Sequence, residues 1–134
     1  MQDYILLALL LTLFQTWLIP MMINIKNLSW MMGARDSTPS ESVLLKRARR
    51  ASVNLHESLA PFLALVLAAM YLEIDVSSLA CWWLILRVVH GLSYLVGIPY
   101  VRTLAYIGSV VCLIMMGVAP VSYTHLRAHE TKAN

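Results

Sequence analysis

Four long apolar stretches constrain the fold of this chain more than any other feature. They cover residues Tyr4–Ile25, Ser52–Leu72, Val76–Val96 and Tyr100–Val121. A helix of about 20 apolar residues crosses the hydrocarbon core of a bilayer. The mean hydropathy of +0.71 and the charged fraction of only 13% lie outside the range of soluble domains. The sequence therefore predicts an all-α integral membrane protein, with one four-helix transmembrane domain over residues 1–121.

The connections between these stretches predict how the helices are arranged. The composition of residues 26–41 predicts a polar loop, and residues 38–41 (Thr-Pro-Ser-Glu) are typical of a helix start. The second helix begins near Ser42 in water and enters the membrane near Ser52. Residues 73–75 and 97–99 form short turns, which join antiparallel neighbours. An antiparallel, up-and-down four-helix bundle is expected.

The distribution of basic residues predicts the orientation. Six of the ten Lys and Arg residues lie between Lys26 and Arg50, so the first loop is expected in the cytoplasm and the N-terminus outside. This asymmetry concerns topology, and no nucleic-acid partner is expected. The first stretch has Asp3 as its only preceding charge, so we interpret it as a retained helix and not a signal peptide.

The remaining polar and sulfur-containing features predict no metal site. Residues 122–134 form a polar C-terminal tail, either a short exit segment or a non-native extension, which we exclude from the fold. His125 and His129 have helical metal-pair spacing, but no third ligand accompanies them, which favours two solvated histidines. Cys81 and Cys112 lie in apolar runs and are expected to be packed free thiols.

A polar face on the second helix is the first indication of a site. At about 100° per residue, Arg47, Arg50, Asn54 and Glu57 fall within roughly 80° of one another. A charged side chain near the bilayer centre costs about 2.5–3.5 kcal/mol, so this face must meet protein or water. Either a binding site or a structural ion-pair network between helices would satisfy that requirement.

The third and fourth helices carry matching polar faces. Arg87, His90 and Tyr94 are spaced three and four residues apart, as are Arg102, Tyr106 and Ser109, with Thr103 beside them. Each of these residues also has a simpler interpretation. Tyrosines are common at membrane interfaces, and His90 could be an ordinary hydrogen-bonded residue inside the bundle. Arg102 could extend its charged end to the lipid headgroups. The predicted topology nevertheless brings these faces together near the cytoplasmic side, which favours a shared cavity.

The residue types in such a cavity favour an anionic ligand. Arginine forks bind carboxylates with two hydrogen bonds and keep their charge at low dielectric. Glu57 could receive an ammonium group, and a guanidinium beside a hydroxyl would lower the pKa of a bound thiol. Glutathione fits this set of groups, and a phospholipid headgroup fits it as well.

The motifs resemble those of the MAPEG family, the membrane-associated proteins of eicosanoid and glutathione metabolism, in their small bacterial form. The resemblance rests on RARRASVNLHESLAPF at residues 47–62, on GARD at 33–36, and on the patterns of the third and fourth helices. It implies a homotrimer of four-helix protomers in a membrane, expected to be the bacterial inner membrane. Glutathione would bind at each subunit interface, near the cytoplasmic face.

The resemblance also implies roles for individual residues. Arg50, Asn54 and Glu57 would bind glutathione from one subunit, and its neighbour would supply Arg87, His90, Tyr94, Arg102 and Tyr106. Arg102 would be the thiol-activating, catalytic arginine, and Thr103 would stand where some relatives carry a hydroxyl donor. Val53 stands where some eicosanoid-synthesising relatives have another arginine. The family's first-helix arginine has no clear counterpart, although Lys26 or Arg35 could serve.

The expected function is therefore a membrane-bound, glutathione-dependent transferase or peroxidase. It would act on lipophilic electrophiles or hydroperoxides that enter from the lipid. One alternative is a non-enzymatic bundle that binds lipids or a partner and uses its polar faces for trimer assembly. A small transporter or channel subunit is disfavoured because the outer halves of the helices are nearly all apolar.

Overall fold

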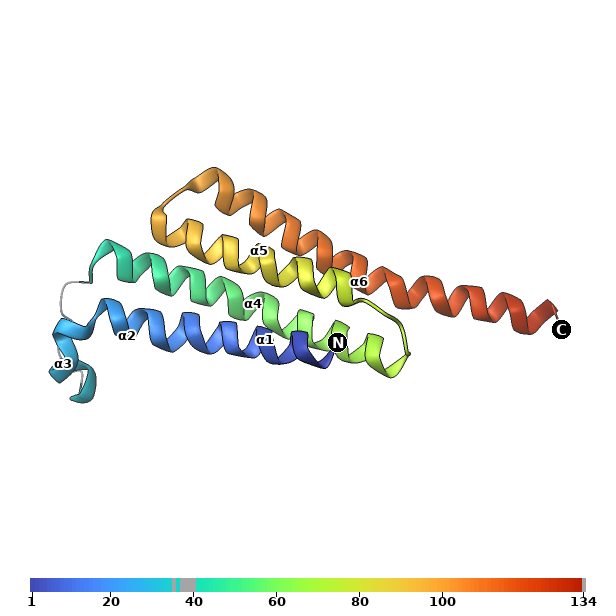
Figure 1. Ribbon diagram of the computed structural model, residues 1–134, viewed down its shortest axis with the longest axis horizontal. Coiled ribbons are helices and arrows are strands. Elements are labelled where there is room, and N and C mark those ends of the chain that lie inside the picture. Colours follow the sequence, from blue (N-terminus) through green and yellow to red (C-terminus); the bar gives the residue numbers. More distant parts are fainter. Residues whose placement is uncertain (35, 37–40, 134) are drawn as a thin grey trace.

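The computed structural model describes residues 1–34, 36 and 41–133 (Figure 1). The elements follow in the order α1 (Gln2–Leu13), a π-helical segment η1 (Phe14–Leu18), α2 (Ile19–Ile23), a 3-10 turn η2 (Ile25–Asn27), α3 (Leu28–Met32), α4 (Val43–Tyr71), α5 (Ser77–Val96) and α6 (Pro99–Ala133). Within the described residues, four helical stretches are long and apolar enough to span a membrane. The predicted all-helical class is confirmed.

The long helices run antiparallel and lie in the order α1, α4, α5, α6 across the bundle (Figure 1). The helix α1 packs against α4 and α5, whereas α5 packs mainly against α6 and α4. The N-terminus and the α4–α5 turn lie at one end, and the α5–α6 turn lies at the other end beside the start of α4. This arrangement is the predicted up-and-down bundle.

The first span contains a local change of helix type. The backbone N–H of Ile19 donates to the carbonyl of Phe14, five residues earlier, in the π-helical segment just before Pro20. Because proline has no N–H, the helix preceding it must satisfy a carbonyl in another way, and a π-turn is one known solution. The span therefore passes Pro20 and ends at Ile23.

The connection after this span differs from the predicted polar loop. The apolar sequence Leu-Ser-Trp-Met-Met forms the short helix α3, which follows a turn held by a 2.7 Å hydrogen bond from Asn27 Nδ2 to Asn24 Oδ1. The expected helix start at residues 38–40, and Arg35, lie outside the described residues. The structure begins α4 at Val43, where the Ser42 hydroxyl accepts from the N–H of Leu45 at 3.1 Å.

The core follows one stripe of α4 and the matching stripe of α5. Buried positions on α4 recur three and four residues apart, as an amphipathic helix requires. At the centre, the rings of Phe62 and Trp83 stack with their centroids 3.9 Å apart. Apolar side chains fill the half of the bundle on the side of the N-terminus, and polar residues gather toward the opposite half.

Two tight turns close the bundle. After α4, Glu73 adopts a left-handed conformation with φ of 56°, and the N–H of Ile74 donates to the carbonyl of Ala69. After α5, Gly97 has φ of 87°, and a Cβ placed there would lie 2.6 Å from the guanidinium of Arg47. This contact brings the start of α4 against the α5–α6 turn.

The last helix is longer than the apolar stretch that predicted it. The structure continues α6 past Val121, and its end projects beyond the bundle (Figure 1). Pro120 lies inside the helix, and the hydroxyl of Thr124 donates to the Pro120 carbonyl at 2.9 Å. The tail residues His125 and His129 are exposed. Cys81 and Cys112 are free thiols, as predicted.

Candidate functional site

Arg87 lies at the centre of the polar half of the bundle. Its side chain is only 1% exposed, and its Nη1 donates a 2.6 Å hydrogen bond to Oδ1 of Asn54 on α4. The guanidinium carbon lies 5.7 Å from the centre of the Trp83 ring and 5.6 Å from that of Tyr106. Cation–π contacts of this kind stabilise a desolvated arginine.

Arg87 and its neighbour Trp83 nevertheless have unused hydrogen-bond donors. Within the described part of the chain, the buried Nε and Nη2 of Arg87 and Nε1 of Trp83 have no hydrogen-bond partner. Buried polar groups are nearly always paired, and a buried donor left alone costs about 1–3 kcal/mol. These atoms therefore mark a place where water or a ligand with acceptor atoms would be stabilised.

A row of aromatic rings connects Arg87 to Arg102. His90 is 3% exposed and meets Tyr94 edge to face, with 5.3 Å between ring centroids. Its ring lies 6.2 Å from that of Tyr106 on α6. The guanidinium of Arg102 stacks 4.7 Å from the Tyr94 ring. We call Asn54, Arg87, His90, Tyr94, Arg102 and Tyr106 the polar seam.

The other expected site residues lie around this seam. Arg50 and Glu57 are exposed on α4, one turn on either side of Asn54. Thr103 is exposed, and its hydroxyl donates to the carbonyl of Pro99 at 3.0 Å. The hydroxyl of buried Ser109 donates to the carbonyl of Tyr106. The seam thus opens toward the outside of the bundle along α4.

The resemblance assigns Asn54 and Arg87 to neighbouring subunits of a trimer, and that assignment stays a prediction. Within one chain, the two side chains are hydrogen-bonded to each other. The reason is the packing of α4 directly on α5, which brings the two polar faces together. A neighbouring subunit is not needed to join them.

Trp83 is a seam neighbour that the polar pattern did not identify. It is fully buried, stacks on Phe62 and lies beneath the Arg87 guanidinium. The available signal was its spacing, because it precedes Arg87 by four residues and so lies on the same helical face. Its ring separates the polar seam from the apolar half of the bundle.

Comparison with known proteins assigns a family. The sequence profile of the MAPEG family matches residues 4–122, which is nearly the whole chain and ends where the polar tail begins. Neither the curated proteins nor the solved structures give a match. Members of this family are membrane glutathione transferases, glutathione peroxidases or related proteins. With four apolar helices and a match of this extent, the chain is an integral membrane protein that belongs to the MAPEG family.

Proposed function

We propose that this protein is a membrane-bound, glutathione-dependent transferase or peroxidase that acts on lipophilic electrophiles or hydroperoxides. The observation that carries the proposal is the buried Arg87, which is hydrogen-bonded to Asn54 and whose Nε and Nη2 have no hydrogen-bond partner among the described residues. A ligand rich in carboxylate and carbonyl oxygens would satisfy them. Glutathione, which the family uses, is such a ligand.

The seam would orient glutathione through complementary groups. Because Asn54 Oδ1 accepts from Arg87, the amide nitrogen of Asn54 is left to donate to a ligand oxygen. Arg50 would bind a carboxylate and Glu57 the ammonium group, both from the exposed edge of α4. His90, Tyr94, Thr103 and Tyr106 would complete the binding site around the peptide. Holding both reactants in place is a proximity contribution to catalysis.

Arg102 would stabilise the glutathione thiolate. Its guanidinium carbon lies 4.7 Å from the centre of the Tyr94 ring, and its N–H groups could donate to an anion beside that ring. A fixed positive charge beside a thiol lowers the thiol pKa and needs no reorganisation during the reaction. The thiolate sulfur would then bond to an electrophilic carbon and release its leaving group. With a hydroperoxide, it would instead bond to the terminal oxygen and release an alkoxide, which takes up a proton.

The exposure of Arg50 and Glu57 supports a site that a second subunit completes. Arg50 faces outward near the start of α4, and Glu57 faces outward two turns further along, where the surroundings are largely apolar. A charge facing lipid there is costly, whereas a neighbouring protomer would cover it. We therefore propose a homotrimer with glutathione at each interface and the seam at the cytoplasmic side. The lipophilic substrate would reach it from the bilayer.

The test is an ultraviolet thiolate difference spectrum of the purified, detergent-solubilised protein titrated with glutathione. We expect a saturable thiolate signal in the parent protein, loss of that signal in Arg102→Ala, and partial recovery in Arg102→Lys. Arg49→Ala is the matched control, because Arg49 is an exposed α4 arginine that pairs with Glu41 away from the seam. If the intact oligomer gives no saturable signal, the seam is an assembly or lipid-binding device and the proposal is wrong.

A further inference from the structure

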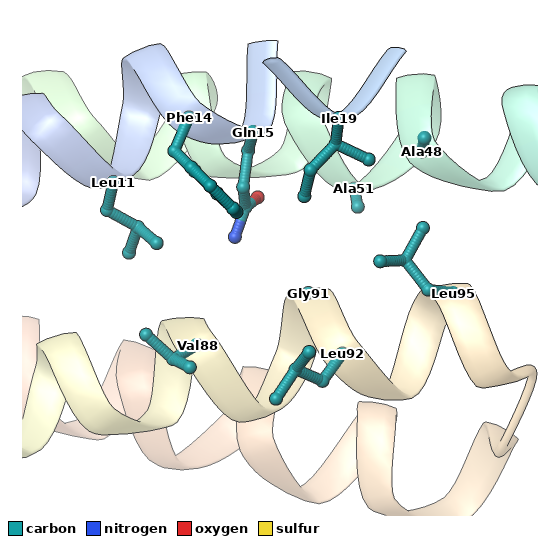
Figure 2. Close-up of a pocket in the computed structure, with 10 residues that line it drawn as sticks. All are labelled: Leu11, Phe14, Gln15, Ile19, Ala48, Ala51, Val88, Gly91, Leu92 and Leu95. Atoms are coloured by element: carbon teal, nitrogen blue, oxygen red, sulfur yellow. The ribbon is translucent and has the colours of Figure 1, made fainter. Parts of the chain in front are cut away.

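A cavity of about 60 Å³ lies on a different side of α5 from the polar seam. It is lined by the first span, α4 and α5 (Figure 2). Ten side chains line it: Leu11, Phe14, Gln15, Ile19, Ala48, Ala51, Val88, Gly91, Leu92 and Leu95. Nine of these are apolar and none is charged, so the amide of Gln15 is the polar side chain of the cavity. Figure 2 shows this amide pointing from the first span toward α5.

The surroundings of the Gln15 side-chain amide favour the binding of a ligand. It is only 7% exposed, and no hydrogen bond joins its amide to another group in the part of the chain that the structure describes. At this depth of the span Gln2–Ile23, lipid offers the amide no partner, and unpaired polar groups there are costly. A molecule that can form hydrogen bonds would therefore be stabilised in this cavity.

The opposite wall is shaped to admit the amide. A Cβ placed on Gly91 would lie 2.5 Å from Nε2 of Gln15, which is too close for a real contact. The absence of a side chain at Gly91 is what leaves room for this nitrogen. Ala48 and Ala51 provide similarly small side chains on α4. The Gln15 amide therefore projects into a recess that is otherwise apolar and in which Gly91, Ala48 and Ala51 leave room for it.

An aliphatic groove leads to this recess. It has a volume of about 640 Å³ and lies between α1 and α5. Its lining is Leu7, Leu10, Leu11, Phe14, Leu84, Ile85, Val88 and Val89, of which Leu11, Phe14 and Val88 also line the cavity. A single alkyl chain lying in the groove would thus have its end group at Gln15.

The chemistry of the recess selects the end group. A primary amide offers one donor and one acceptor side by side, and a neutral carboxylic acid matches both with two hydrogen bonds. A carboxylate would meet no cation among the ten lining residues, so its burial would be strongly unfavourable. We propose that the recess at Gln15 binds the protonated carboxyl end of a single-chain fatty acid, whose alkyl chain occupies the α1–α5 groove.

The proposal does not depend on glutathione chemistry. On α5, Arg87, His90 and Tyr94 face the seam, whereas Val88, Gly91 and Leu92 face the recess, about 100° away around the helix. A binding measurement without glutathione tests the recess alone. Its failure and the failure of the proposed enzyme function are therefore separate results.

The test uses oleic acid with a ¹³C-labelled carboxyl group, bound to the detergent-solubilised full chain. We expect saturable binding, with an infrared carbonyl band characteristic of a neutral, hydrogen-bonded acid. The variant Gln15→Leu keeps the side-chain size and removes both hydrogen bonds, so affinity should fall roughly tenfold. Methyl oleate cannot donate a hydrogen bond, so it should bind the parent protein more weakly than oleic acid does. The difference in affinity between the parent protein and Gln15→Leu should also be smaller for methyl oleate than for oleic acid.

Two further variants keep the test decisive. Gln2→Leu makes the same chemical change at an exposed position of α1 and should leave affinity unchanged. Gly91→Ala should fold, because the added Cβ meets only the flexible end of Gln15, and it should weaken oleic acid binding by displacing that amide. Equal affinity of the parent, Gln15→Leu and Gly91→Ala would overturn the proposal. So would a lack of saturable binding, which would leave water as the partner of the amide.

Discussion

Arg87 is the residue on which the polar seam depends. A guanidinium that is 1% exposed would ordinarily be too costly inside a membrane bundle. Here two aromatic rings and the Asn54 oxygen each offset part of that cost. Nε and Nη2 have no hydrogen-bond partner in the part of the chain that the structure describes. The fold therefore fixes the position of the Arg87 side chain and leaves part of its hydrogen-bonding capacity for a ligand.

The hydrogen bond between Arg87 and Asn54 should be measurable as a coupling energy. We expect a double-mutant cycle of Arg87→Met and Asn54→Ala to give about 1.5 kcal/mol in the free energy of unfolding. This value is near the upper end for hydrogen bonds in membrane proteins, because the donor is charged. Unfolding by denaturing detergent, followed by tryptophan fluorescence, provides the measurement. The pair Asn54 and Arg102 serves as the control cycle, and equal coupling in both would refute a specific bond.

A carboxylate outside the membrane should give the protein a distinct acid sensitivity. The Ser77 hydroxyl and the Ser77 N–H, at 2.9 Å from Oδ1, hold the pKa of Asp75 below its usual value of 3.8. The charged form is therefore favoured by folding, and this contribution is complete above pH 3.8 and lost as the pH falls below it. Apparent Tm values of the parent and Asp75→Asn should converge as the pH is lowered through this range. A difference that does not change with pH would contradict this expectation.

Spacing along single helices predicted much of the seam. It placed Arg87, His90 and Tyr94 on one face, and the edge-to-face contact of His90 with Tyr94 agrees with that prediction. It could not pair Arg87 with Asn54 inside one chain, because that pairing depends on how α4 is rotated against α5. Gln15 was overlooked because a single polar residue in an apolar span has no periodic pattern, and its recess is formed by three separate helices.

At the scale of whole elements, the ends of the helices show which local rules decide the boundaries. Gly97 ends α5 in the left-handed conformation that glycine adopts most easily, and this turn was predicted from its Gly and Pro residues. Glu73 ends α4 in a similar conformation without that advantage. Apolar content made α3 a helix inside a predicted loop. The long α6 shows that a polar segment with good helix formers continues a helix once it has started.

Glycine at position 73 should stabilise the bundle. A left-handed conformation costs an ordinary L-residue about 1–2 kcal/mol, and glycine avoids this cost but loses more entropy on folding. Glu73→Gly should therefore raise the free energy of unfolding by about 0.5 kcal/mol, seen as a small rise in Tm of the detergent-solubilised protein. The opposite change, Gly97→Ala, should lower Tm and displace Arg47 from the turn. A fall in Tm for Glu73→Gly would show that Glu73 makes contacts that outweigh its backbone conformation.

At the scale of the whole molecule, the distribution of polarity limits what the bundle can do. The polar seam occupies the half near the α5–α6 turn, and the stacked Phe62 and Trp83 close it from the apolar half. A continuous polar path across the membrane is therefore not formed by the described residues of one protomer. This arrangement fits a ligand site that opens at one membrane face and at the surface of α4, where Arg50 and Glu57 are exposed.

The exposed α4 residues distinguish a ligand site from an assembly device. If Arg50 and Glu57 bind glutathione at a subunit interface, Arg50→Ala and Glu57→Ala should each weaken glutathione binding by roughly tenfold or more, since each removes a charge-assisted hydrogen bond. The oligomer, measured by native mass spectrometry in detergent, should stay intact. Lys46→Ala, an exposed charge change on the same helix, should alter neither property. If either variant dissociates the oligomer instead, the polar face exists to join protomers, because an exposed charge on α4 can be stabilised by another protomer as well as by a ligand.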